Sequence, residues 1–297
     1  MSDSHKEQPS TYFVQDRNNQ EELARLQVQD QMITRAIGGV LPEQPDPASF
    51  QRVLDIGCGT GGWLIETAKT YPTMTRLYGV DISGTILDYA RVQAETSQVN
   101  DRVEFIVMDA LRMLEFPDHF FDLVNIRFAE SWIRTWEWPK MLQEMQRVSK
   151  PGGIIRITDA NGTAGSNSPA LNRLYLLGIQ AMYQAGYYFT PDGASVINHL
   201  PDLMYQHGVL NIQSRAFTVE FRAGTSEGQL FAENMKLAYR TIQPFLKKWL
   251  RLPDDYETIY QQMLIEMQAP DFVARWDVLT AWGCNEGFQI FFSEQER

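Results

Sequence analysis

The chain has 297 residues, of which 44% are hydrophobic and 12% aromatic, and this is enough to bury a full core as one large domain. Its net charge is −11, and acidic residues outnumber basic ones in both halves, which disfavours nucleic acids and anionic membranes as partners. The first residues are polar, without an apolar stretch behind a basic start, so we expect neither secretion nor a membrane anchor.

The cysteine content predicts a reduced, cytoplasmic protein. The two cysteines, Cys58 and Cys284, lie far apart in the chain, and Cys58 is inside a glycine-rich motif. Histidines and cysteines are not clustered at the spacing of metal ligands, so no metal is expected.

The first predicted element is a helix near the N-terminus. Asn19 can cap it with Glu22 at the capping-box position, and Gly38 and Gly39 end it. Three prolines between residues 42 and 47 then form a stiff connector into the first predicted strand.

The strongest motif is VLDIGCGTGG at residues 53–62. An apolar run of β-forming residues ends in an acid and a cluster of glycines, and an apolar-periodic helix begins at Trp63. Glycines suit a tight turn with positive φ, and they let a ligand approach the backbone N–H groups at the helix N-terminus. The motif therefore predicts a strand, a ligand-binding turn and a helix.

The glycines fit two cofactor motifs. Gly57, Gly59 and Gly62 have the dinucleotide spacing G-x-G-x-x-G, whereas Asp55 with Gly57, Gly59 and Gly61 has the spacing D-x-G-x-G-x-G. Asp55 favours the second, because a carboxylate there would repel a pyrophosphate but suits the ammonium of a methionine moiety. In this motif the sequence resembles the class I S-adenosylmethionine (SAM) dependent methyltransferases. A nicotinamide or flavin site remains the alternative.

Two further predicted strands also end in acids. Residues 75–80 lead to Asp81, after which Ser83 can cap a helix, and residues 103–108 lead to Asp109. Asp81 follows the glycine turn at about the ~20-residue offset at which a carboxylate reaches ribose hydroxyls. Asp55, Asp81 and Asp109 are thus expected at the carboxyl ends of neighbouring strands.

Strands at 120–126 and 154–159, with a helix at 139–148 between them, complete five strand and helix alternations. This spacing predicts right-handed crossovers and a parallel sheet. Mostly helix follows, with helices expected from Ser168 and at 194–207, 226–250 and 254–281, and strands at 211–222 and 287–292.

The resemblance implies a Rossmann-like methyltransferase fold, which is an α/β, doubly wound, mostly parallel seven-stranded sheet, here with helical cap insertions. The last two strands would pair antiparallel at the sheet edge, with a long helical insertion between them. We expect residues 1–50 to form a tail and a helix that either closes over the cofactor as a lid or covers a sheet edge. Residues 51–160 would form the SAM-binding core, and residues 161–297 the cap insertions and last two strands.

The resemblance also implies which residues hold SAM. Asp81 would accept from the ribose, and Asp109 from the adenine amino group. The cofactor-binding residues it implies are Asp55, Gly57, Cys58, Gly59, Gly61, Asp81, Ile82, Asp109, Ala110, Asn125 and Arg127.

SAM is an activated electrophile, so the protein mainly has to hold a nucleophile in line with the methyl group. A nucleophilic triad is neither expected nor visible. The candidate catalytic residues are Tyr12, Arg127 and His199, and His207 or Asp159 could also act as a base. Arg127 either meets an anionic group of the acceptor or cofactor, or forms an ion pair with Glu130.

The predicted function is methyl transfer from SAM to a small, apolar or aromatic metabolite at an oxygen, nitrogen or carbon atom. The chain resembles the small-molecule group (methyltransferase type 11) that includes the quinone-biosynthesis methyltransferases. The alternatives are a SAM-binding protein with another reaction or a ligand-binding role in natural-product metabolism, and a nicotinamide-dependent oxidoreductase. The sequence allows a homodimer and leaves the acceptor open.

Overall fold

The computed structural model describes Tyr12, Val14, residues 20–161 and residues 165–286. The strands are β1 (Arg52–Ile56), β2 (Arg76–Asp81), β3 (Val103–Val107), β4 (Phe121–Arg127), β5 (Ser149–Asn161), β6 (Val209–Arg222) and β7 (Val273–Asn285). The α-helices are α1 (Gln20–Ala36), α2 (Gly62–Thr70), α3 (Gly84–Thr96), α4 (Trp138–Val148), α5 (Pro169–Gln184), α6 (Leu200–Gln206), α7 (Ser226–Thr241), α8 (Gln243–Trp249) and α9 (Tyr256–Glu266). Short 3-10 turns are η1 (Pro47–Ser49), η2 (Ala129–Ser131) and η3 (Val196–Asn198).

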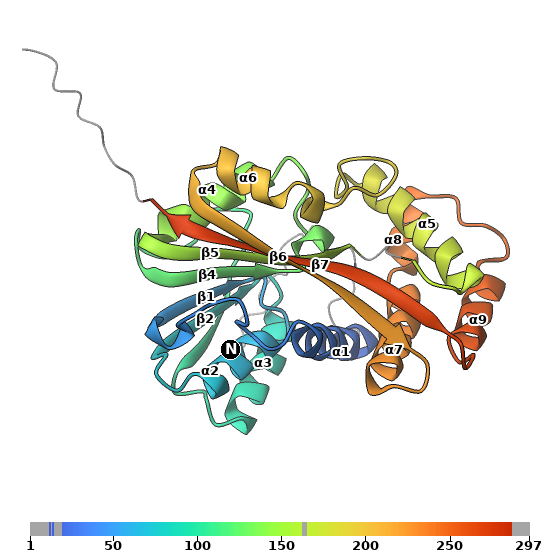
Figure 1. Ribbon diagram of the computed structural model, residues 1–297, viewed down its shortest axis with the longest axis horizontal. Helices are drawn as coiled ribbons and strands as arrows, with labels where there is room; N and C mark the ends of the chain where they lie inside the picture. Colours follow the sequence, from blue (N-terminus) through green and yellow to red (C-terminus); the bar gives the residue numbers. More distant parts are fainter. Residues whose placement is uncertain (1–11, 13, 15–19, 162–164, 287–297) are drawn as a thin grey trace, which may run out of the picture.

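All seven of these strands form one sheet, in the order β3-β2-β1-β4-β5-β7-β6 (Figure 1). The first five are parallel, and β7 runs antiparallel to both β5 and β6. Because the parallel strands all end at the same edge, the turns that follow β1, β2, β3 and β4 are brought together there. The predicted seven-stranded, mostly parallel fold is confirmed.

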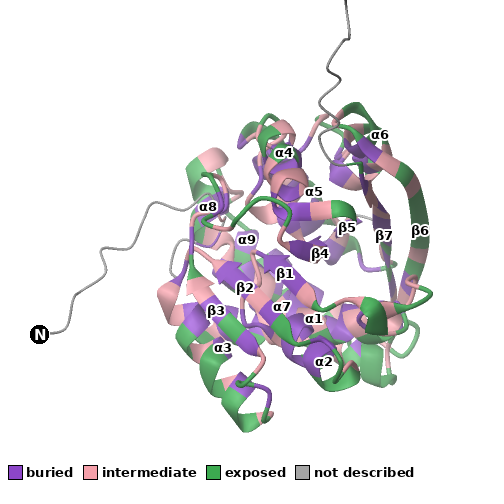
Figure 2. Cartoon of the chain, turned by 90° about the vertical axis from the view of Figure 1, so that its left-hand side faces the viewer, coloured by how far each residue is buried: buried purple, intermediate pink, exposed green. Residues whose placement is uncertain are grey.

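Three apolar clusters hold the sheet and helices together. Helices α2 and α3 pack on one face of the parallel strands, and α4 and α6 pack on the other. The third cluster joins α1, α5, α7, α8 and α9 to the far ends of β6 and β7. Figure 2 shows that the faces turned toward the sheet are buried while the outer faces of α2, α3 and β6 are exposed. The division into segments 1–50, 51–160 and 161–297 stays a prediction.

Polar side chains mark where several helices begin. The Ser83 hydroxyl accepts from the backbone N–H of Ile86 at the start of α3, and Ser168 accepts in the same way from Leu171 in α5. Such caps satisfy N–H groups that have no partner inside the helix. The caps predicted at Ser83 and Ser168 are therefore present.

The helix predicted at 254–281 is wrong in its second half. Helix α9 ends at Glu266, and β7 begins at Val273. From Ala274 to Val278, buried residues alternate with exposed ones, as the exposed Arg275 and the buried Trp276 illustrate, and this period of two is that of a strand. The closing strand predicted at 287–292 lies outside the described residues, and β7 takes the antiparallel place expected for it.

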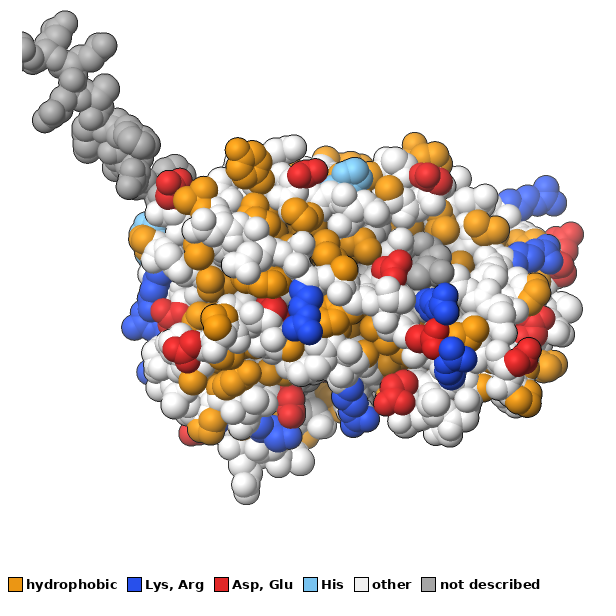
Figure 3. Space-filling view, viewed as in Figure 1, with side chains coloured by type: hydrophobic (Ala, Val, Ile, Leu, Met, Phe, Trp, Pro, Cys, Tyr) orange, Lys and Arg blue, Asp and Glu red, His pale blue; other side chains and the backbone are white. Residues whose placement is uncertain are grey.

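The surface does not gather one sign of charge on the face seen in Figure 3, where basic and acidic side chains are interspersed. Among the described residues, no helix combines the length and the apolar character needed to cross a membrane. Cys58 and Cys284 are both free thiols.

A buried ion pair ties the connector before β1 to the middle of the sheet. Arg156 in β5 donates from Nε to Glu43 Oε1 at 2.7 Å, and both side chains are almost completely buried. Arg156 also donates from Nη1 to Asn125 Oδ1 in β4 at 2.8 Å.

We predict that Glu43→Ala destabilises the protein by about 3–5 kcal/mol, because it leaves a buried guanidinium without its counter-charge. Urea unfolding followed by circular dichroism measures the loss. The double variant Glu43→Ala with Arg156→Met should recover most of it, and a loss below about 1 kcal/mol in the single variant would contradict the role given to the pair.

Candidate functional site

The glycine turn between β1 and α2 has the backbone shape that the sequence predicts. Gly57, Gly59 and Gly61 all have positive φ, at 68°, 53° and 73°. The backbone N–H groups of Gly57 and Cys58 donate to the carbonyl of Val80, at 2.8 and 3.0 Å, which fixes the turn against β2. The three glycines therefore share a conformation that residues with a side chain rarely adopt.

The three glycines differ in what surrounds them. A Cβ on Gly59 would meet nothing within 4 Å, so this position faces open space. A Cβ on Gly61 would lie 2.5 Å from the ring of Phe105, and one on Gly57 would lie 2.7 Å from Trp132. Gly61 is thus required by core packing, whereas Gly59 leaves room for a ligand against the backbone.

Asp55 is held at the end of β1 by a chain of side chains. Asn125 in β4 donates from Nδ2 to Asp55 Oδ1 at 2.7 Å, and the Asn125 amide oxygen accepts from Arg156. This second bond fixes which end of the amide faces the acid. Burial raises the pKa of Asp55 to about 7, and nearby Arg127 and the Asn125 bond oppose the rise. A cation arriving beside Asp55 would favour its ionised form.

The two other strand-end acids lie where the sequence predicts them. Asp81 accepts from the backbone N–H of Gly59 at 3.1 Å and of Ser83 at 2.9 Å, so its carboxylate joins the turns after β1 and β2. Asp109 accepts from the N–H of Leu111 at 3.0 Å, in the turn after β3. Both carboxylates are on the same edge of the sheet as Asp55.

Arg127, at the end of β4, joins this edge to helix α1. One guanidinium nitrogen pairs with Asp30, and the other donates to the Thr34 hydroxyl at 2.9 Å. The ion pair with Glu130 considered from the sequence is therefore wrong, because α1 supplies the acid instead. The Asp30 carboxylate also lies against Gly62 at the start of α2, where a Cβ would meet it at 2.3 Å.

One cavity of about 400 Å³ opens at the carboxyl ends of the parallel strands. Most of the predicted site residues line it, and they are Tyr12, Asp55, Gly57, Cys58, Gly59, Asp81, Ile82, Asp109, Ala110 and Arg127. Gly61 and Asn125 do not line the cavity. Gly61 allows close packing against Phe105, and Asn125 holds Asp55 through a hydrogen bond. The strand-end residues are thus brought together around one space.

His199 is placed away from this cavity. It precedes α6, its ring packs against Phe189 with centroids 4.3 Å apart, and its Nε2 is buried without a hydrogen-bond partner. His207 follows α6 and faces the carbonyl of Leu203 at 2.8 Å. The cavity lining among the described residues contains neither histidine.

Tyr12 lines the cavity and belongs to a buried polar cluster. Its hydroxyl donates to Glu22 and accepts from Arg25, both in α1, and Glu22 also accepts from Thr241 in α7 at 2.8 Å. Burial raises the pKa of Tyr12 well above its usual value, with the negative charge of Glu22 adding to the effect. Tyr12 is therefore a poor base and supports Glu22, which links α1 to α7.

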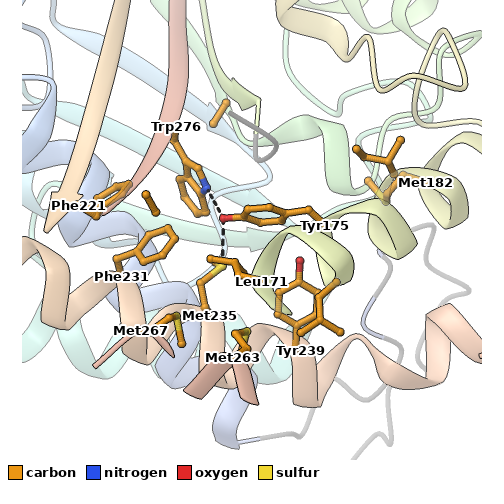
Figure 4. Packing of buried hydrophobic residues seen from close by; sticks show 14 of the residues in the cluster. Leu171, Tyr175, Met182, Phe221, Phe231, Met235, Tyr239, Met263, Met267 and Trp276 are labelled. Carbon is orange, nitrogen blue, oxygen red and sulfur yellow. Dashed lines mark hydrogen bonds between the residues drawn. The ribbon is translucent and has the colours of Figure 1, made fainter. Parts of the chain in front are cut away.

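The cap closes the inner end of the same cavity with apolar and aromatic side chains. This end, which we call the inner chamber, is lined by Tyr175, Ile179, Met182, Tyr188, Met235, Ala238, Tyr239, Ile242 and Trp276. Tyr175 accepts from the Trp276 indole at 3.3 Å and contacts the sulfur of Met235, which brings α5, α7 and β7 to one point (Figure 4). An apolar chamber beside polar strand ends suits a small, largely apolar ligand.

Sequence reasoning missed three groups of lining residues. Helix α1 contributes Leu26, Gln29 and Asp30, and the loop after β4 contributes Glu130. Helix α7 contributes the wall that faces α5. Only Glu130 carries a sequence signal, because it follows the end of a predicted strand by a few residues, as ligand-binding residues in this fold often do.

The family comparison agrees with this geometry. A family model described as a methyltransferase domain matches residues 53–153. Residues 53–153 therefore resemble a methyltransferase domain. The predicted resemblance to class I methyltransferases is confirmed, and the cofactor of that family is SAM.

Two relatives are similar to part of the chain. Methyltransferase GfsG of Streptomyces halstedii is 35% identical over 122 residues, which are 40% of this chain and 41% of that protein. The demethylmenaquinone methyltransferase of Geobacillus stearothermophilus is 34% identical over 104 residues, which are 35% of this chain and 43% of that protein. The chain spans less than half the length of these relatives, so their likeness is limited to part of each protein.

A solved structure supports the fold over most of the chain. Phosphoethanolamine N-methyltransferase 2 of Haemonchus contortus, in complex with phosphomonomethylethanolamine and S-adenosylhomocysteine, gives a TM-score of 0.53 at 19% identity. The match covers 92% of this chain and 60% of that one. At this identity the likeness establishes the fold and leaves the acceptor open.

We predict different outcomes for alanine at Gly59 and Gly61, two positions of the glycine turn that share a positive φ. Gly59→Ala should keep the fold and weaken SAM binding at least about tenfold, since the new Cβ fills the ligand's approach to the backbone. Gly61→Ala should lower stability by about 1–3 kcal/mol more than Gly59→Ala does, because its Cβ runs into Phe105.

Calorimetric titration with SAM and thermal unfolding measure the two effects. Both variants place alanine at a positive φ, so they share that backbone strain. The difference in stability between them therefore reflects the atoms around each glycine. Equal SAM affinity in Gly59→Ala and the unchanged protein would refute the binding role of this position.

Proposed function

We propose that the chain is a SAM-dependent methyltransferase whose acceptor is a small, largely apolar or aromatic molecule. The observation that carries this proposal is the continuity of one cavity from the acidic strand ends to the inner chamber. A cofactor at the strand ends and an acceptor in the chamber would then lie side by side in a single space, as methyl transfer requires.

The residues present fit SAM. Asp81 and Asp109 offer carboxylates at the ends of adjacent strands for the ribose and the adenine, and Gly59 leaves its side-chain position open. Asp55, whose pKa is raised to about 7 by burial, suits the ammonium of the methionine part. Bound there, SAM would supply a methyl group on a positively charged sulfur.

The chain's own contribution is then orientation and exclusion of water. The backbone of the glycine turn and the acids hold one reactant, while α1 and the cap enclose the other. Such positioning supplies ~7–11 kcal/mol of a reaction barrier without any covalent chemistry by the protein. We further propose a small acceptor and not a nucleic acid, because the net charge of −11 opposes polyanions.

A second function would use the same cavity without methyl transfer, as a SAM-binding protein with another reaction. Only transfer generates S-adenosylhomocysteine in proportion to a methylated product. The nicotinamide alternative has less support, since the two acids Asp30 and Asp55 lie beside the glycine turn and would repel a pyrophosphate.

We predict that incubation with methyl-labelled SAM and a panel of apolar metabolites transfers label to one of them, with S-adenosylhomocysteine released in equal amount. Asp81→Ala should lower SAM affinity at least about tenfold, because it removes a charged acceptor worth ~1.5–3 kcal/mol. Asp118→Ala, which removes an exposed carboxylate elsewhere, is the matched control.

Mass spectrometry identifies the product, and calorimetry gives the affinity. SAM binding without any release of S-adenosylhomocysteine across the panel would favour the second function. Unchanged affinity in Asp81→Ala would overturn the assignment of Asp81.

A further inference from the structure

The cavity contains, within the inner chamber and beside it, polar atoms that no described residue satisfies. Glu130 lines the cavity, and its Oε2 is buried without a hydrogen-bond partner. Tyr188 and Tyr239 also line it, are only 7% exposed each, and make no side-chain hydrogen bond with the described residues. Buried polar groups are normally paired, so unpaired ones around a cavity indicate a ligand that supplies the partners.

These atoms belong to one cluster. Glu130 donates its backbone N–H to Asp159 Oδ2 at 3.0 Å, so the acid at the end of β5 lies directly behind it. Besides burial, the negative charges of Glu130 and Asp159 raise the pKa of Tyr188. Tyr188 in turn contributes to the raised pKa of Tyr239. The carboxyl pair and the two hydroxyls therefore lie together at the junction of β4, β5, α5 and α7.

The two carboxyls are not equivalent. Asp159 accepts backbone N–H groups from Glu130 and from Ala160, at 3.0 and 2.9 Å, which stabilises its charged form. Glu130 has no such donors on Oε2. Burial raises the pKa of Asp159 to about 7 and that of Glu130 well above its usual value, with Asp159 adding to the second effect. The negative charge of the pair therefore belongs first to Asp159, and Glu130 is the carboxyl that holds a proton more readily.

Within the part of the chain that the structure describes, no basic side chain balances this charge. Among the described residues that line the cavity, the acids are Asp30, Asp55, Asp81, Asp109 and Glu130, and the basic residues are Arg25 and Arg127. Arg25 pairs with Glu22 and Arg127 with Asp30, both outside the inner chamber. Burial and the charge of Asp159 raise the pKa of Glu130, and Ser195 opposes the rise. No basic side chain contributes to this pKa.

We propose that Glu130, backed by Asp159 and Tyr188, binds the amino group of the methyl acceptor and takes its proton, so that the acceptor is an amine on an apolar skeleton. An ammonium brings the missing positive charge and two or three N–H donors to unpaired acceptor atoms. The aromatic rings of the inner chamber add favourable contacts to a cation. This inference rests on the proposed methyl transfer and names its acceptor class.

The proton and electrons of this step balance. Amine binding first displaces the proton of the carboxyl pair to water, which leaves Glu130 ionised. The ammonium proton then passes to a carboxylate oxygen of Glu130, which frees the nitrogen lone pair. That lone pair forms the new N–C bond to the methyl carbon as the S–C bond breaks, and its electrons stay on sulfur. Glu130 then returns the proton to water, so each turnover moves one methyl group and releases one proton.

The test uses the complex with S-adenosylhomocysteine, in which no transfer occurs, and compares matched probes. 2-Phenylethylamine and octylamine are titrated against their alcohols, 2-phenylethanol and octanol, by calorimetry. We expect at least one amine to bind at least about tenfold more tightly than its alcohol, the worth of a charged hydrogen bond. Glu130→Gln should remove this preference, whereas Glu104→Gln, an exposed site in β3, should keep it.

The pH dependence of amine affinity distinguishes whether Glu130 acts through its charge or only through packing. Amine affinity should rise from about pH 6 to about pH 8, because ionisation of the carboxyl pair must precede ion pairing, and Glu130→Gln should flatten this rise. Titrations in phosphate and in Tris buffer should show proton release on amine binding. Glu130→Gln must keep its affinity for S-adenosylhomocysteine, which checks the fold.

Three results would overturn the inference. They are equal affinity for amines and alcohols, a preference that survives Glu130→Gln, and the absence of binding by either amine. A protein that fails to bind S-adenosylhomocysteine would instead overturn the proposed function, so the two failures are distinguishable.

Discussion

The hydrogen-bonded chain from Glu43 through Arg156 and Asn125 to Asp55 is the interaction on which the site depends. It crosses the sheet from β5 through β4 to β1, and every member of it is largely buried. A buried carboxylate without such support would be protonated or would pull water into the core. The chain keeps Asp55 in one orientation at the strand end. It also explains why Asn125, which does not line the cavity, still determines the shape of the site.

The helices that line the inner chamber pack against the far ends of β6 and β7, which belong to the main sheet. Strands β6 and β7 pair along their whole lengths and extend beyond the parallel strands, so their far ends carry α7, α8 and α9 (Figure 1). Tyr175, Met235 and Trp276 then meet over the carboxyl ends of the parallel strands. Because the chamber wall is fixed to the sheet edge, its position relative to the cofactor end is set by strand pairing.

Features encoded locally were predictable, and those that depend on distant pairing were not. The acids Asp55, Asp81 and Asp109 each follow a short apolar strand, so their common edge follows from parallel pairing alone. The partner of Arg127 required knowing that α1 crosses the sheet edge, because Asp30 is 97 residues away along the chain. Glu130 was first considered only as an ion-pair partner, since nothing in the sequence indicates that Asp159 lies behind it. The sequence of β7 has the alternation of side chains that its buried and exposed faces require. This segment was nevertheless predicted as part of a long helix.

Helix α1 supplies charge as well as cover. A helix N-terminus attracts anions, and in a dinucleotide-binding protein a pyrophosphate takes that place. Here the Asp30 carboxylate lies against Gly62 at the start of α2 and is held by Arg127. The protein therefore places its own carboxylate beside this helix start, and the described residues that line the cavity include more acids than bases. A cavity so arranged binds positively charged groups, which is the charge that a sulfonium cofactor brings.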